Sequence, residues 1–146
     1  MMGAEMTGLL QELAGRFAYR FGGFAVNMDG YYLAGVGFLD IANDGTLKGN
    51  HRFSLLRLRG QDELKTGEYS LAGTLSMNSD GTGSAKVRFT TNSSGFDNSD
   101  SSFHVILGSD INHLWFITAG GKRVGSGNPT CELTQLEAVR MNPLPS

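Results

Sequence analysis

The chain has 146 residues, of which 40 % are hydrophobic and 18 % are charged, and its formal net charge at pH 7 is −2. This length is enough for one domain with a hydrophobic core, and the near-neutral charge excludes the basic surface expected of a protein that binds nucleic acid or an anionic membrane. The single cysteine, Cys131, excludes a disulfide framework within the chain and a cysteine-based zinc site.

The first 15 residues carry the only helical pattern in the sequence. Thr7 is a suitable N-cap, Leu9, Leu10 and Leu13 fall on one stripe, and Gly15 ends the pattern. The segment has no basic start and its apolar run is too short for a secretion signal, while no other stretch has the length of a membrane span. We therefore expect a cytoplasmic protein.

Strand patterns fill the rest of the chain. Eight strands are predicted, over residues 16–28, 31–42, 47–58, 67–78, 83–91, 102–107, 113–119 and 130–141. No crossover helix separates them, so neighbouring strands should pair antiparallel. Closure of the first strand onto the eighth would remove both open edges. The sequence thus predicts an all-β domain: an eight-stranded antiparallel up-and-down (meander) barrel over residues 16–141, preceded by a short N-terminal helix in residues 1–15.

A repeat supports this meander. Asp44-Gly45-Thr46 recurs as Asp80-Gly81-Thr82, and the Gly and Leu positions upstream of the two motifs also match at the same offset. Asp-Gly between alternating strands is a strong hairpin signal, so both turns should lie on one rim, together with residues 108–112. The opposite rim should carry the longer loops 58–66, 92–102 and 120–130, and the helix should lie near the tight-turn rim, where it could plug the barrel.

The chain resembles the small eight-stranded meander barrels of the calycin type, and in particular the allene-oxide-cyclase-like barrels. The resemblance covers residues 16–141 and rests on the strand count, the opening "GRFAYRF", the "DGT" hairpins and the short N-terminal helix. It implies a lumen that can hold an apolar ligand, or a cofactor-free cyclase that moulds a flexible lipid- or polyketide-like substrate. It transfers no catalytic residue by motif.

Alternation along the strands predicts which side chains face the lumen. The expected ligand-binding residues are Phe17, Tyr19, Phe21, Tyr69, Leu71, Phe89, Phe103 and Trp115, whereas Arg16, Arg20, Glu68, Lys86 and Arg88 should face water. The third, sixth, seventh and eighth strands are apolar on both faces or irregular, so their inward parity stays open. An apolar outer face on the last three strands would be covered by self-association, most simply in a homodimer.

Three residues are candidates for chemistry. His104 lies near the long-loop rim and could act as an acid or base if it faces the lumen. Glu137 would be a buried carboxylate with a raised pKa if its face of the eighth strand is the lumen, and otherwise a solvated residue. Tyr69 would direct a hydroxyl inward, toward either a ligand or a neighbouring side chain. The three histidines are too dispersed for a metal site, so neither a metal nor a cofactor is expected.

Three functions fit this pattern. The first is a barrel that binds a small, largely apolar or amphiphilic molecule, and the second is the cofactor-free cyclase or isomerase. The third is a filled structural barrel that acts through its surface. An open lumen would favour the first two, and a lumen filled by Phe17, Phe21, Phe89 and Phe103 would favour the third.

Overall fold

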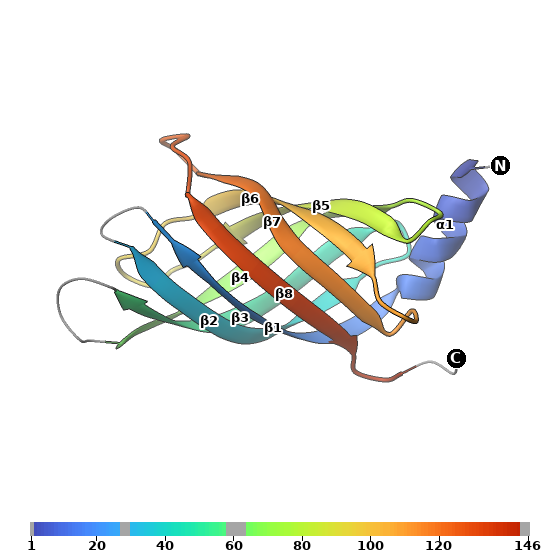
Figure 1. Cartoon of the computed structure of the whole chain (residues 1–146), viewed down its shortest axis with the longest axis horizontal. Helices are drawn as coiled ribbons and strands as arrows, with labels where there is room; N and C mark the ends of the chain where they lie inside the picture. The colour runs from blue at the N-terminus through green and yellow to red at the C-terminus, as the bar shows by residue number, and fades with distance from the viewer. Residues whose placement is uncertain (1, 27–29, 58–63, 144–146) are drawn as a thin grey trace.

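The predicted eight-stranded antiparallel meander barrel is confirmed. A computed structural model describes residues 2–26, 30–57 and 64–143. Each strand pairs antiparallel with the next one along the chain, and β1 pairs with β8, which closes the sheet (Figure 1). The elements are α1 (Met2–Leu13), β1 (Gly15–Ala25), β2 (Tyr31–Ile41), β3 (Thr46–Arg57), β4 (Leu64–Met77), β5 (Thr82–Thr90), β6 (Ser99–Leu107), β7 (His113–Arg123) and β8 (Glu132–Arg140).

Several strands are longer than predicted at the end with the longer loops. β4 begins at Leu64 and β6 at Ser99, because polar residues continue the ladders there: Lys65 pairs with Leu55, and Asp100 with Arg88. The Arg88 guanidinium donates two hydrogen bonds of 2.8 Å to the Asp100 carboxylate on the outer face. The connections 91–98 and 124–131 remain as loops at this end, whereas most of the predicted loop 58–66 lies outside the described residues.

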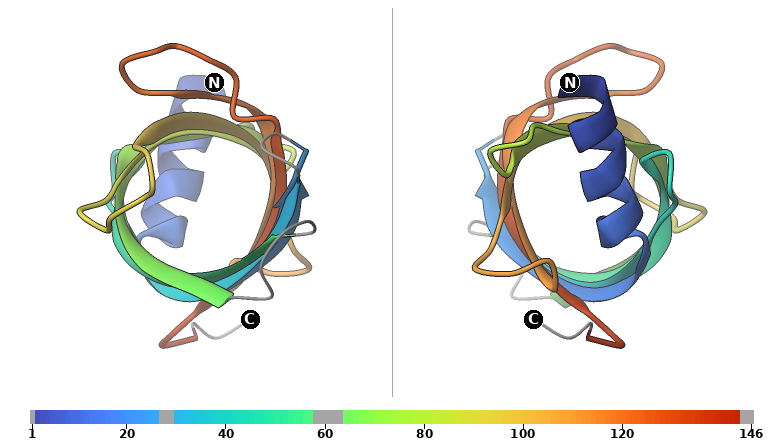
Figure 2. Two further views of the ribbon diagram at one scale, coloured as in Figure 1. Left: turned by 90° about the vertical axis from the view of Figure 1, so that its left-hand side faces the viewer. Right: turned by 90° about the vertical axis from the view of Figure 1, so that its right-hand side faces the viewer.

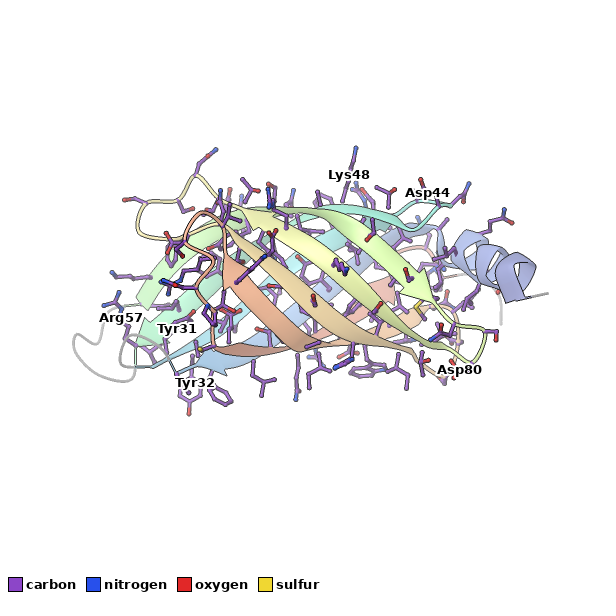
Figure 3. All side chains as sticks on the ribbon, turned by 90° about the horizontal axis from the view of Figure 1, so that it is seen from above. Tyr31, Tyr32, Asp44, Lys48, Arg57 and Asp80 are labelled. Carbon is purple, nitrogen blue, oxygen red and sulfur yellow. The ribbon has the colours of Figure 1, made fainter. Side chains whose placement is uncertain are left out.

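The repeated Asp-Gly-Thr motifs are equivalent hairpin turns on one rim, and Figure 3 shows Asp44 and Asp80 at the end of the barrel that carries α1. The carboxylate of Asp44 accepts a hydrogen bond from the Thr46 amide at 2.9 Å, and Asp80 does the same with Thr82 at 3.0 Å. Gly45 and Gly81 have φ values of 89° and 88°, which non-glycine residues seldom adopt. The 36-residue offset therefore marks one position in successive hairpins.

The helix α1 lies across this rim, as the right-hand view of Figure 2 shows. Leu13 is fully buried, and Leu9 and Leu10 pack against the core. Arg140, only 5 % exposed at the end of β8, donates hydrogen bonds of 2.8 Å to the carbonyl oxygens of Glu12 and Ala14. Since the last carbonyls of a helix have no partner within the helix, this cation anchors α1 to the barrel. Within the described part of the chain, no helix has the length and apolar character needed to cross a bilayer.

The predicted parity of β1, β4 and β5 agrees with the burial of their side chains. Eight residues at the inward positions of these strands are no more than 8 % exposed: Phe17, Tyr19, Phe21, Leu71, Leu75, Met77, Ala85 and Val87. The less buried Tyr69 and Phe89, at the edge of the cavity described below, pack beside them. The structure also shows which side chains face the lumen on strands whose inward parity the sequence left open. Phe53 and Leu55 face inward on β3, and Leu114 and Phe116 on β7, so that Trp115 and Ile117 face outward.

Candidate functional site

A cavity occupies the half of the lumen that lies away from α1. Its inner chamber has a volume of about 100 Å³ and is bounded mainly by aromatic rings and hydroxyl groups from all eight strands and the adjoining loops. An outer chamber of about 140 Å³ continues it to the mouth, since Tyr31, Tyr69, Phe96 and Glu132 line both. Figure 3 shows Tyr31 and Arg57, which line the outer chamber, at the end opposite α1.

His51 is the polar residue at the centre of the aromatic lining. It lies on β3 two residues before the inward-facing Phe53, and it is 8 % exposed. Its ring centroid is 4.5 Å from that of Phe21 and 5.6 Å from those of Tyr69 and Phe89. Gly37, opposite His51 on β2, makes room for it, because a Cβ at Gly37 would lie 2.5 Å from the His51 Cβ.

A hydrogen bond of 2.7 Å joins His51 Nδ1 to the Tyr19 hydroxyl. Burial lowers the pKa of His51 to about 4 and raises that of Tyr19, so both are neutral at pH 7. Among the described residues the Tyr19 hydroxyl has no other acceptor, so it donates to Nδ1, and Nε2 carries the hydrogen. That Nε2–H group has no hydrogen-bond acceptor within the described part of the chain.

The mouth end of the lumen is polar. The Tyr31 hydroxyl donates to Glu132 Oε2 at 3.1 Å, and the Thr134 hydroxyl donates to Oε1 at 3.0 Å. The Tyr69 hydroxyl donates to the carbonyl oxygen of Asp97 in the loop after β5, at 2.8 Å. Burial, with smaller contributions from Glu132 and Asp97, raises the pKa of Tyr69 to about 12, which keeps this hydroxyl a neutral donor. The lumen thus grades from an aromatic interior to a mouth with a carboxylate.

Four of the eight predicted ligand-binding residues line the inner chamber: Phe21, Tyr69, Phe89 and Phe103. Phe17, Tyr19 and Leu71 are buried in the lumen but do not line the cavity. Phe17 lies instead beneath the Arg140 guanidinium, 4.7 Å from its ring centroid, near α1. Trp115 does not face the lumen at all: it is 46 % exposed on the outer face of β7.

Two of the three candidates for chemistry also face outward. His104 is exposed on β6, opposite Ile117, because the inward positions of that strand belong to Phe103 and Val105. Glu137 is on the outer face of β8, where its carboxylate accepts a hydrogen bond of 2.9 Å from Arg20. The prediction that His104 or Glu137 acts in the lumen is therefore wrong, and of the three candidates only Tyr69 lines the cavity.

His51 and Glu132 are two of the lumen residues that sequence reasoning missed. His51 lies in the middle of β3, opposite Gly37 and Tyr69. Its orientation follows from alternation as soon as Phe53 is known to face inward. Glu132 shares its face of β8 with Thr134, Leu136, Ala138 and Arg140, a set with three polar members that gives no clear hydrophobic signal for the lumen side.

Outside the barrel, a groove of about 870 Å³ runs over β1 and β5–β8. Ile106, Trp115 and Ile117 form its apolar floor and are 52 %, 46 % and 38 % exposed. The ion pair between Arg20 and Glu137 lies within it. This is the apolar outer face expected on the last three strands, and its cover by a second copy of the chain stays a prediction.

Comparison with known proteins shows no family for this chain. No protein-family model matches the sequence, and no curated protein matches it either. Among solved structures, the chain is similar to the crystal structure of Rv2717c from M. tuberculosis, with a TM-score of 0.39 and 13 % sequence identity over 94 % of this chain and 98 % of that chain. The narrower resemblance to allene oxide cyclases and calycins stays a prediction.

Proposed function

We propose that the barrel binds one small, largely apolar molecule in its inner chamber, with a hydrogen-bond acceptor of the ligand facing His51. The observation that carries this proposal is the Nε2–H group of His51, which is buried beside the cavity and has no acceptor among the described residues.

An unsatisfied buried donor costs about 1–3 kcal/mol, and a phenylalanine at this position would remove that cost among rings such as Phe21 and Phe89. Polar groups kept at such a cost are found preferentially where a protein has a functional use for them. A ligand oxygen or nitrogen that accepts from Nε2 satisfies the donor, while the surrounding rings bury the apolar part of the ligand.

The volume of the cavity limits the size of the ligand. Chambers of about 100 and 140 Å³ are comparable with the roughly 150 Å³ cavity that holds one benzene molecule in a protein core. A single ring with a short substituent therefore fits. A long-chain lipid or a polyketide does not, which disfavours the cyclase alternative with such a substrate. The filled structural barrel is disfavoured by the chamber itself, which stays open between Phe21, Phe89 and Phe103.

The probe for this function is 2-(4-hydroxyphenyl)ethanol, whose phenol oxygen can accept from Nε2. We expect saturable binding in isothermal titration calorimetry. Ser101→Leu should weaken it at least about tenfold, because Ser101 lines the inner chamber and added methyl groups fill that space. Ser84→Leu is the matched control, since Ser84 is exposed on the outer face of β5. Equal affinity in the two variants, or no binding to the wild type, would overturn the proposal.

A further inference from the structure

We propose that the ligand of the lumen is a small organic cation, an arylalkylammonium whose charged group pairs with Glu132 while its ring lies among the aromatic side chains. This inference rests on the function proposed above and adds the charge of the ligand. It follows from the distribution of charge along the lumen.

Glu132 is the only charged side chain among the described residues that line the inner chamber. It accepts one hydrogen bond at each oxygen, from Tyr31 and from Thr134. A carboxylate has about four acceptor positions, so two remain. Among the described residues, no Lys, Arg or His forms an ion pair with it. Glu132 therefore offers a negative charge to the lumen that no described cation neutralises.

The basic residues of this end lie further out. Arg57, Lys65 and Arg123 line the outer chamber but not the inner one. Arg123 is also engaged by the Asp97 carboxylate, at 3.7 Å. An anionic ligand in the inner chamber would lie beside the Glu132 carboxylate, whereas these three cations line only the outer chamber, so the arrangement favours a cation inside.

The walls of the cavity suit a cation as well. Phe53, Tyr69 and Phe96 form a continuous group of rings, with centroids 5.2 Å apart for Phe53 and Tyr69 and 4.8 Å apart for Phe53 and Phe96. All three line the inner chamber, and Tyr69 and Phe96 also line the outer one, as Glu132 does. The face of an aromatic ring attracts an ammonium group, and this attraction is stronger where water is excluded. Rings and carboxylate together can replace the water that an ammonium group loses on entry.

The tyrosines at the mouth report the same sign of the local field. Burial is the main cause of the raised pKa values of both hydroxyl groups, the negative charge of Glu132 raises both further, and Arg123 lowers that of Tyr31 by a smaller amount. The contribution of Glu132, unlike that of burial, favours a positive charge at this place.

The test compares three probes that share one ring: tyramine, which is a cation at pH 7, the neutral 2-(4-hydroxyphenyl)ethanol, and the anion 3-(4-hydroxyphenyl)propionate. We expect tyramine to bind about tenfold more tightly than the neutral probe, as a charge-assisted hydrogen bond with cation–π contact would give, and the anion to bind most weakly. Glu132→Gln should remove the preference for tyramine and leave the affinity for the neutral probe within about twofold.

Glu137→Gln is the matched control, because it makes the same substitution on the outer face of β8, and it should keep the preference for the cation. If the neutral probe binds but tyramine binds no better, or if Glu132→Gln keeps the preference, the inference about charge is wrong while the proposed function stands. If the neutral probe fails to bind the wild type, the proposed function fails. A thermal melt followed by circular dichroism verifies that each variant is folded.

Discussion

The hydrogen-bonded pair of His51 and Tyr19 should make the stability of the barrel depend on pH in a defined window. Burial lowers the pKa of His51 to about 4 in the folded protein, whereas an unfolded histidine has a pKa of about 6.5. As the pH falls below about 6.5, the unfolded chain takes up a proton that the folded protein refuses. Stability is therefore lost as the pH falls from about 6.5 to about 4, and the loss is complete below the lower value.

A shift of this size corresponds to a loss of about 3 kcal/mol in the free energy of unfolding. The titratable side chains in contact with the His51 ring are Tyr19 and Tyr69, and both have raised pKa values, so neither carries charge in this range. Acidic residues with lowered pKa values stabilise the fold above their ordinary pKa and lose that contribution at lower pH, mostly below the window of His51. These are Asp40, Asp44, Asp80, Asp100 and Asp110.

The assay is urea unfolding followed by circular dichroism at a series of pH values, for the wild type and for the double variant Tyr19→Phe/His51→Phe. The double substitution removes both partners of the hydrogen bond, so no polar group is stranded, and such replacements are close to neutral. At pH 7.5 we expect the free energy of unfolding of the double variant to equal that of the wild type or to exceed it slightly. At pH 4 it should exceed that of the wild type by about 3 kcal/mol. His104→Gln, exposed on β6, should follow the wild type. Parallel profiles for the wild type and the double variant would refute the reasoning.

Two further predictions concern the hairpin rim and the outer groove. Gly45→Ala should destabilise the protein clearly more than Gly81→Ala, as measured by urea unfolding. Both glycines have nearly the same positive φ. However, a Cβ at Gly45 would collide with the Leu75 carbonyl oxygen, whereas the atom nearest to a Cβ at Gly81 is 3.5 Å away. Equal losses, each of about 1–2 kcal/mol from the backbone conformation alone, would contradict the account. For the outer groove, sedimentation should show the wild type as a dimer and Ile117→Glu as a monomer. A wild type that stays monomeric over the whole concentration range would disprove self-association.

The fold was predictable because the alternation of apolar and polar residues in β1, β4 and β5 shows which face of these strands is buried. In β1, the buried Phe17, Tyr19 and Phe21 alternate with the exposed Arg16 and Arg20, and such alternation leaves one choice for the inward face. The repeated turn motif supplied the hairpins, and closure followed from the need to remove two edges.

The site was less predictable because β8 reverses the usual pattern. Its inward face carries the polar residues Glu132, Thr134 and Arg140 beside Leu136 and Ala138, while Leu133 is 40 % exposed on the outer face. Two physical requirements explain this reversal. Arg140 supplies donors for the carbonyl groups at the end of α1, and Glu132 lies in a wide, polar mouth. Neither requirement is visible in the sequence of one strand, since each depends on elements that only the closed barrel brings beside β8.

The anchored helix covers one end of the barrel, so the cavity of the lumen opens at the opposite end. A ligand bound as proposed would have to leave by the opening through which it entered, so one molecule would depart before another could bind. Among the described residues, the loops 91–98 and 124–131 lie at that opening, so we expect changes in these loops, and not in α1, to alter the rate of exchange.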